Sequence, residues 1–316
     1  MKPAPFTYHR ASSAEEAVSL LQELGDESKI LAGGQSLVPI MNFRLAQPSA
    51  LVDVSRLDQL AYIRRDGNAV RIGALTRHRD IELSIYTASA SNPSASVPAV
   101  DVAGRRPSAA NPAAVVGFEV LPRSARWIGH LPIRTRGTIG GSLAHADPTA
   151  EWCVLAQLLD AEVTVLGASG SRTIPAHQWF AGFMETDCGA EEMVTEVTFP
   201  RPRPTAALTE YAQRHGDFGI AVAAVALDVR NGCCADVAIS LGGVRGTPVR
   251  MPDLERDLSG QPATADTWRA AGAAAAAAVD PPSDVHGSVA YRKHLVGTLV
   301  ERAFAQAVAT TAPVLV

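Results

Sequence analysis

The sequence predicts an α+β fold in two parts, a larger domain over residues 1–200 and a smaller domain over residues 205–316. The length of 316 residues allows two or three separate hydrophobic cores. Short apolar runs alternate with helical segments in the first part, whereas strands precede helices in the second. Alternating prolines in segment 200–204 exclude helix and central strand, so we expect an extended connector between the domains there.

The first 55 residues are expected to form one subdomain. Its helix starts at Ser12 or Ser13, keeps its apolar residues at helical spacing and ends at Gly25. Strands are expected around Phe6 and Tyr8, at 30–31 and at 51–54, with a short helix or turn over 37–45. This order places Gly33 and Gly34 at the end of a strand, where backbone donors are free.

Residues 56–200 are expected to form a second subdomain. It begins with a hairpin over 63–75, where residues alternate around an Asp-Gly-Asn turn, and a helix opens at Thr76. A further helix starts at 148–151 and continues through Leu159, and its positive N-terminal end suits a phosphate. Strands are expected at 163–166 and 196–199.

The second subdomain is interrupted by residues 84–124. This stretch is rich in alanine, serine, proline and valine and has no helical or strand period. Structureless segments of this length are uncommon inside a compact domain. We expect an irregular insertion here.

The C-terminal domain is expected to begin with two apolar strands, over 221–229 and 237–241, joined through the hairpin signal Asn231-Gly232. Helices are expected over 255–258, 268–279 and 291–308. The alanine run 273–278 has high helix propensity and is expected to be a packed or partly exposed helix.

Composition excludes several classes of function. The net charge of −4, without a basic cluster, argues against nucleic acid as a partner. No run reaches the ~18 apolar residues of a membrane span, and the first residues lack a signal core, so we expect a cytoplasmic protein without stable membrane insertion. Cys153, Cys188, Cys233 and Cys234 form no Cys-x-x-Cys pair, so we expect reduced thiols and no bound metal or iron–sulfur cluster.

Two glycine motifs carry the strongest functional signal. Gly33 and Gly34 are followed by Gln35 and Ser36, and a related sequence occupies 138–142. Paired glycines let backbone N–H groups approach a bound anion without side chains in the way. Neither motif has the spacing of a Gly-x-Gly-x-x-Gly or a P-loop. One such pair is more often an ordinary tight turn, but two together predict two walls of one diphosphate site.

In this order, the two motifs closely resemble the flavin-binding motifs of the FAD-binding medium subunit of molybdenum-containing hydroxylases, a family that includes carbon monoxide dehydrogenase and xanthine dehydrogenase. The likeness extends through 70–76, 125–137 and 211–221, and covers nearly the whole chain apart from 84–124. It implies a two-part, PCMH-type (vanillyl-alcohol-oxidase-like) FAD-binding domain followed by the C-terminal domain of this flavoprotein type.

The resemblance also implies which residues hold non-covalent FAD. They are Lys29, Leu31, Ala32, Gly33, Gly34, Gln35, Ser36, Leu37, Thr138, Ile139, Gly140, Gly141, Ser142, Ala146, Asp147, Val194 and Phe218. Simpler roles stay open for four of them: Lys29 as a solvated charge at a strand end, Asp147 as a helix cap, and Val194 and Phe218 as core packing. His145 is not expected to act as a base, because electron transfer through the flavin needs no catalytic side chain.

In this family the flavoprotein does not oxidise the organic substrate. The resemblance implies a large partner subunit with the molybdenum cofactor, a small partner subunit with [2Fe–2S] clusters, and a dimer of such heterotrimers. The flavin would pass electrons from the clusters to an external acceptor. Two alternatives stay open: a stand-alone FAD-dependent oxidase of the same flavin fold, and a cofactor-free assembly protein.

Overall fold

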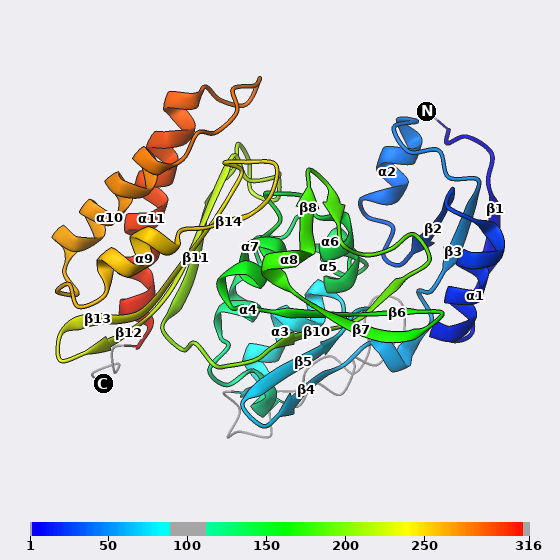
Figure 1. The fold of residues 1–316 in the computed structure, drawn as a ribbon, viewed down its shortest axis with the longest axis horizontal. Coiled ribbons are helices and arrows are strands. Elements are labelled where there is room, and N and C mark those ends of the chain that lie inside the picture. The colour runs from blue at the N-terminus through cyan, green and yellow to red at the C-terminus, as the bar shows by residue number, and fades with distance from the viewer. Residues whose placement is uncertain (1, 89–111, 312–316) are drawn as a thin grey trace.

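The computed structural model describes residues 2–88 and 112–311 and shows a mixed α and β fold in two domains (Figure 1). The strands form sheets of three, five and four strands and a separate two-stranded hairpin. In Figure 1 the sheets follow one another from the N-terminal sheet, on the right, to the C-terminal sheet and its helices, on the left. The predicted α+β class is confirmed.

The N-terminal sheet consists of parallel strands in the order β1-β3-β2. Its elements are β1 (Thr7–Arg10), α1 (Ala14–Leu24), β2 (Ser28–Leu31), α2 (Leu37–Asn42), β3 (Ala50–Asp53) and the 3₁₀ turn η1 (Asp58–Leu60). Helix α1 begins where predicted, because the Ser13 side chain accepts a hydrogen bond from the Glu16 N–H at 3.1 Å. Its apolar stripe of Ala17, Val18 and Leu21 packs on this sheet.

The five-stranded sheet forms the centre of the molecule, in the order β4-β5-β10-β6-β7. Its strands are β4 (Ile63–Asp66), β5 (Ala69–Gly73), β6 (Glu162–Gly167), β7 (Gly170–Pro175) and β10 (Met193–Phe199). The associated elements are α3 (His78–Ala88), α5 (Leu131–Arg134), α6 (Ile139–His145), α7 (Glu151–Leu158), α8 (Ala176–Trp179), β8 (Phe180–Gly182) and β9 (Glu185–Thr186). The predicted hairpin over 63–75 corresponds to β4 and β5.

The segment predicted to be an irregular insertion is partly regular. Helix α3 continues to Ala88, and the turn η2 (Pro112–Val115) and helix α4 (Val120–Ser124) occupy its end. Phe118 and Leu121 are fully buried, so this end of the segment contributes to the main core, although Val116 is 56% exposed. The rest of the predicted insertion, 89–111, lies outside the described residues.

The C-terminal sheet is antiparallel, in the order β11-β12-β13-β14. Its strands are β11 (Ala206–Tyr211), β12 (Ala221–Arg230), β13 (Cys233–Gly242) and β14 (Val249–Arg250). In β12, Val222 and Ala224 join the core of the N-terminal domain, whereas Ala223 and Val225 join the core beneath the C-terminal helices. Both faces of the sheet are buried, which explains why β12 is a continuous apolar run rather than an alternating one.

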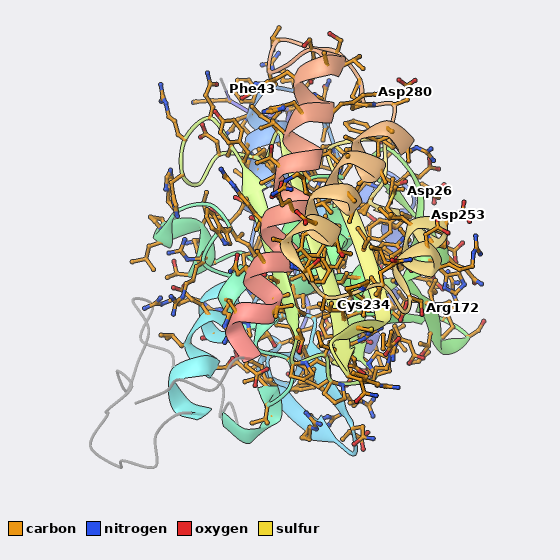
Figure 2. All side chains as sticks on the ribbon, turned by 90° about the vertical axis from the view of Figure 1, so that its left-hand side faces the viewer. Asp26, Phe43, Arg172, Cys234, Asp253 and Asp280 are labelled. Carbon is orange, nitrogen blue, oxygen red and sulfur yellow. The ribbon has the colours of Figure 1, made fainter. Side chains whose placement is uncertain are left out.

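The C-terminal helices are α9 (Pro252–Leu258), α10 (Ala265–Ala278) and α11 (Val289–Thr311), and all three predicted helices are confirmed with shifted ends. Figure 2 shows α10 and α11 lying across the outer face of the sheet. Trp268 and Phe304 stack between them, with ring centroids 4.7 Å apart. No helix in the described ranges combines the length and apolarity that a membrane crossing requires.

Candidate functional site

A cavity of about 580 Å³ lies at the carboxyl ends of the parallel strands of the N-terminal sheet. Ligands commonly bind at this edge of a parallel sheet, because loops and free backbone groups gather there. The lining comes from strands β1, β2 and β3, helix α2 and the segment before the second glycine motif: Tyr8, Leu31, Ala32, Gly33, Gly34, Gln35, Val38, Pro39, Asp53, Ser55, Arg77, Thr135 and Arg136.

The first glycine motif supplies unpaired backbone donors to this cavity. Strand β2 ends at Leu31, and the chain then turns through Gly33 and Gly34 before α2 begins at Leu37. The N–H groups of residues 33–36 have no hydrogen-bond acceptor among the described residues. Buried or half-buried backbone donors are nearly always paired, so consecutive free N–H groups along a cavity wall indicate a place for an anion.

The two glycine motifs lie side by side, as the sequence predicted. A Cβ at Gly33 would lie 2.8 Å from the Gly137 Cα and 2.9 Å from the Arg136 carbonyl carbon, so only glycine permits this approach of the two backbones. A second, looser contact joins the motifs, because a Cβ at Gly141 would come 3.9 Å from the Ala32 Cβ, at ordinary van der Waals distance. The structure therefore brings together residues that are about a hundred positions apart in the chain.

The second glycine motif differs from the prediction in one respect. It is not an open loop but the first turn of α6, and its N–H groups already have acceptors. Thr138 caps this helix by accepting from the Gly141 N–H at 3.1 Å, and the Gly140 N–H donates to the Ala74 carbonyl at 2.9 Å. None of residues 138–142 lines the cavity, so the free amides come from the first motif alone.

Charged side chains in the cavity were missed by the sequence analysis. Arg77 and Arg136 line it at the end where the two motifs meet, and Arg77 also donates to the Arg136 carbonyl oxygen. Asp53 lies at the end of β3, where it accepts from the Tyr8 hydroxyl and from the Ser55 N–H at 2.8 Å. Although burial acts to raise it, the pKa of Asp53 is lowered by these hydrogen bonds and by Arg10, so the carboxylate is charged.

A buried histidine supports the second motif from behind. His78 begins α3, its N–H donates to the Gly137 carbonyl at 3.1 Å, and its Nδ1 accepts from the Trp152 indole N–H at 3.0 Å. Burial, followed by the charges of Arg77 and Arg134, lowers the pKa of His78 to about 3. The imidazole is therefore neutral at physiological pH and serves to position the Arg136–Thr138 segment.

The remaining predicted residues lie at different distances from this cavity. Lys29 is exposed on β2 and does not line it. Asp147 accepts from the N–H and hydroxyl of Thr149, at 2.8 and 2.7 Å, in a turn that leads into α7. Val194 is buried in β10, and Phe218 is 69% exposed in the connection between β11 and β12. Core packing is therefore the local role of Val194 but not of Phe218.

Two further predicted residues lie at opposite ends of α6. Ala146 adopts a left-handed conformation, with φ of 53°, and its N–H donates to the Ser142 carbonyl at 3.0 Å. This contact ends the helix and turns the chain toward Asp147. Ile139 is fully buried, so its side chain anchors α6 in the core and only its backbone can take part in the site.

Two carboxyl groups meet where the domains pack. Burial, followed by the charge of Asp147, raises the pKa of Glu151 on α7, and burial, followed by the charge of Glu151, raises the pKa of Glu210 on β11. The pair therefore holds protons more tightly than free carboxyl groups do.

Over residues 2–88 and 112–311 no group of three or more histidine, cysteine, aspartate or glutamate side chains is arranged to bind a metal ion.

Comparison with known proteins identifies both domains. Residues 4–202 match the family described as the FAD binding domain in molybdopterin dehydrogenase, and residues 206–307 match the CO dehydrogenase flavoprotein C-terminal domain. These two matches cover nearly the whole chain.

Individual relatives are similar over their full length. The 6-hydroxypseudooxynicotine dehydrogenase complex subunit alpha of Paenarthrobacter nicotinovorans is 39% identical over 99% of this chain and 98% of its own. The glyceraldehyde dehydrogenase medium chain of Sulfolobus acidocaldarius is 32% identical over 96% of this chain and 99% of its own. A chain in a structure of carbon monoxide dehydrogenase from Hydrogenophaga pseudoflava superposes with a TM-score of 0.84 at 32% identity, covering 99% of this chain and 100% of that one. The chain therefore belongs to the family of FAD-binding medium subunits of molybdenum hydroxylases.

Proposed function

We propose that this chain binds FAD in the cavity beside the two glycine motifs and transfers electrons through it, from [2Fe–2S] clusters on a small partner subunit to an external acceptor. The observation that carries this proposal is the run of free N–H groups over residues 33–36, which faces a cavity with two arginines and one buried carboxylate. When bound, FAD supplies the redox chemistry, and the protein supplies position and charge.

The residues present suit a dinucleotide. The free amides, with Arg77 and Arg136, would hold the diphosphate, because backbone N–H groups and guanidinium groups are strong donors to phosphate oxygens. Asp53 would accept hydrogen bonds from sugar hydroxyls, since a carboxylate placed against the diphosphate itself would repel it. The hydroxyls of Ser36, Thr138 and Ser142 would add side-chain donors.

The remaining predicted contacts belong to this proposal as well. They extend from the diphosphate toward the isoalloxazine ring and comprise Lys29, Leu31, Ala32, Gln35, Leu37, Ile139, Gly140, Gly141, Ala146, Asp147, Val194 and Phe218. Phe218 supports the ring contact best among them. It is a large aromatic side chain that the folded chain leaves 69% exposed, although burying such a side chain is strongly favourable.

Substrate oxidation is assigned to a different subunit, which carries the molybdenum cofactor. The described residues hold no metal-binding cluster, so the metal centres would lie on partner chains. The relatives are named for chemically unrelated substrates, 6-hydroxypseudooxynicotine, glyceraldehyde and carbon monoxide, although their flavoprotein chains are similar. A flavin subunit that does not contact the substrate explains this spread. We propose a cytoplasmic dimer of heterotrimers, each with a large and a small partner subunit.

Purification of the tagged chain from its native cells tests the function. We expect FAD, molybdenum and iron to co-purify with two further subunits, and substrate to reduce the flavin only in the complex. Reduction of the flavin in the isolated chain by an organic substrate would instead indicate a stand-alone oxidase. A colourless chain that takes up no added FAD would indicate an assembly protein, and either result would refute the proposal.

A further inference from the structure

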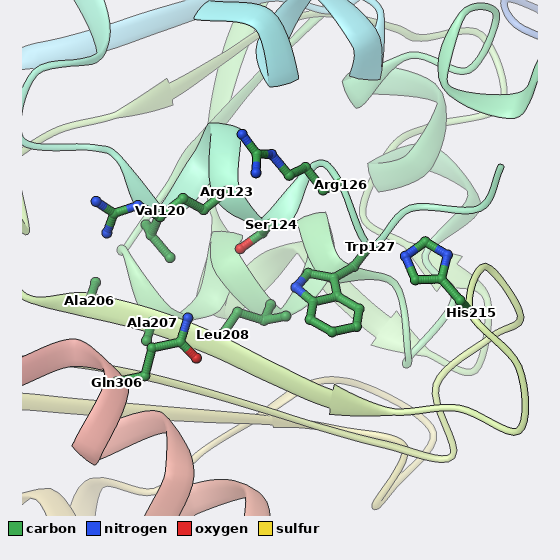
Figure 3. A pocket seen from close by; sticks show the side chains of 10 residues that line it. All are labelled: Val120, Arg123, Ser124, Arg126, Trp127, Ala206, Ala207, Leu208, His215 and Gln306. Atoms are coloured by element: carbon green, nitrogen blue, oxygen red, sulfur yellow. The ribbon is translucent and has the colours of Figure 1, made fainter. Parts of the chain in front are cut away.

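A second cavity, of about 370 Å³, lies at the junction of the two domains (Figure 3). The N-terminal domain contributes α4 and the residues that follow it, and the C-terminal domain contributes β11, α11 and the connection between β11 and β12. The two cavities share no lining residue, so a ligand here would not occupy the place proposed for the FAD diphosphate, although His215 lies in the same connection as Phe218.

Polar side chains without partners converge on this cavity. Ser124 is only 2% exposed, yet its hydroxyl has no hydrogen-bond partner within the described part of the chain, and Figure 3 shows it pointing into the hollow. The Ser124 hydroxyl is not among the described side-chain atoms that are both buried and unpartnered, so it is accessible from the cavity and free to bind a ligand or water. The Trp127 indole N–H edge points toward the same space, and no described residue accepts from it.

Arg123 adds a positive charge at the same place. It lies in the last turn of α4 and is half-buried, and neither an ion pair nor a hydrogen bond joins its guanidinium group to any described residue. The amide of Gln306, on α11, lies across the cavity from it and is also unpaired among the described residues. A guanidinium group, an indole N–H, a hydroxyl and an amide together make a site that is rich in donors, which suits an anion.

The rest of the wall is mostly apolar. Its apolar residues are Val120, Ala206, Ala207 and Leu208, Arg126 adds a second arginine to the lining, and the Trp127 ring stacks on His215 at one end with ring centroids 5.9 Å apart. A volume of this size lies at the lower end of the range for small-molecule sites. Apolar walls beside a cluster of donors fit a ligand with a carboxylate at one end and a compact apolar or aromatic body.

We propose that the junction cavity binds a small organic carboxylate, held by Arg123, Ser124, Trp127 and Gln306. Because three of these residues belong to the N-terminal domain and Gln306 belongs to the C-terminal domain, the bound ligand would join the domains and raise the temperature at which they unfold. This inference does not depend on the identity of the electron donor or acceptor.

Trp127 provides a direct readout. It is 39% exposed, whereas Trp152, Trp179 and Trp268 are at most 5% exposed, so a ligand in this cavity should change mainly the Trp127 fluorescence. The purified flavoprotein would be titrated with benzoate, with benzyl alcohol as the same body without the charge, and with inorganic phosphate as a charge without the body. We expect saturable quenching by benzoate, confirmed by calorimetry, and at least roughly tenfold weaker binding of the other two.

Matched variants locate the site. We expect Arg123→Gln to weaken benzoate binding by roughly tenfold or more, the loss typical of a charge-assisted hydrogen bond. Arg256→Gln removes an exposed arginine of α9 that does not line the cavity, and it should leave binding unchanged. If Arg123→Gln fails to fold, Ser124→Ala gives the same test with a several-fold loss.

Three results would overturn the proposal. The first is the absence of any saturable change with benzoate in the folded, FAD-loaded protein. The second is equal benzoate affinity in Arg123→Gln and Arg256→Gln. The third is benzyl alcohol binding as tightly as benzoate, which would show that the guanidinium group takes no part. Retention of flavin absorbance in every variant separates these results from a failure of the proposed flavin function.

Discussion

Replacing Gly33 with alanine tests whether the contact between the two glycine motifs positions the cofactor. The added Cβ would lie 2.8 Å from the Gly137 Cα and 2.9 Å from the Arg136 carbonyl carbon, and contacts under 3.0 Å are essentially never seen. Both neighbours are backbone atoms, so no side chain can rotate away. The two loops would have to separate by roughly 0.5 Å or more to restore ordinary contact.

The expected loss follows from the bonds that this shift would weaken. Each hydrogen bond from an amide to a charged group contributes ~1.5–3 kcal/mol. Weakening one or two of the bonds from residues 33–36 would therefore cost about 2–5 kcal/mol of binding free energy. At 1.4 kcal/mol per factor of ten, this predicts an FAD affinity lower by on the order of 30- to 3,000-fold.

The assay is FAD occupancy per chain, measured from flavin absorbance after desalting, together with FAD titration of the stripped protein. Gly246→Ala is the matched control, because its Cβ would lie 3.5 Å from its nearest neighbour, the Phe183 Cβ, at ordinary contact distance. We expect full occupancy in Gly246→Ala and severe loss in Gly33→Ala. Equal FAD affinity in the two variants would refute the reasoning.

Three further predictions concern groups around the two cavities. Thr138→Val removes the cap on the Gly141 N–H and should lower the free energy of unfolding by ~1 kcal/mol in a denaturant titration. Thr138→Ser keeps the hydroxyl and should cause no such loss. Equal losses in the two variants would contradict a capping role for Thr138. The pKa of His78 is depressed in the folded state, so its contribution to stability is complete above its unfolded pKa of 6.5 and falls as the pH drops toward 3. The free energy of unfolding should therefore decrease less from pH 7 to pH 4.5 in His78→Gln than in the unmodified protein. The pKa of Glu210 is raised in the folded state, so its contribution to stability is complete below its unfolded pKa of 4.5 and is lost as the pH rises through its folded pKa. Glu210→Gln should therefore raise the melting temperature at alkaline pH. An unchanged melting temperature there would exclude the Glu151–Glu210 interaction.

Much of the fold could be predicted from the sequence because local signals and tertiary contacts agree. The Ser13 cap and the apolar stripe of α1 predicted that helix, and Asn231-Gly232 predicted the turn between β12 and β13. Strand β11 was missed because it follows the proline connector closely and becomes a strand only by pairing with β12. The elements η2 and α4 were missed for a similar reason, since they are held by packing of η2 against α3 and β4 and of α4 against α3.

The candidate site shows the same limits. Glycine pairs predicted two walls that meet, and the structure brings them into contact. The sequence could not show that Thr138, Ala74 and Thr76 already satisfy the N–H groups of the second motif, because these acceptors lie on two separate segments. Asp53 and Arg136 have no characteristic spacing from the motifs. The one signal that could have pointed to Arg136 is its position directly before Gly137, at the entry to the second motif.

Amide hydrogen exchange with and without FAD tests the central claim most directly, because free and paired N–H groups respond differently to a bound anion. Our account predicts that FAD strongly protects the amides of residues 33–36, which have no acceptor in the described structure, and changes those of Gly140 and Gly141 little, since they are already hydrogen-bonded. Unchanged exchange over residues 33–36 in the FAD-loaded protein would contradict it.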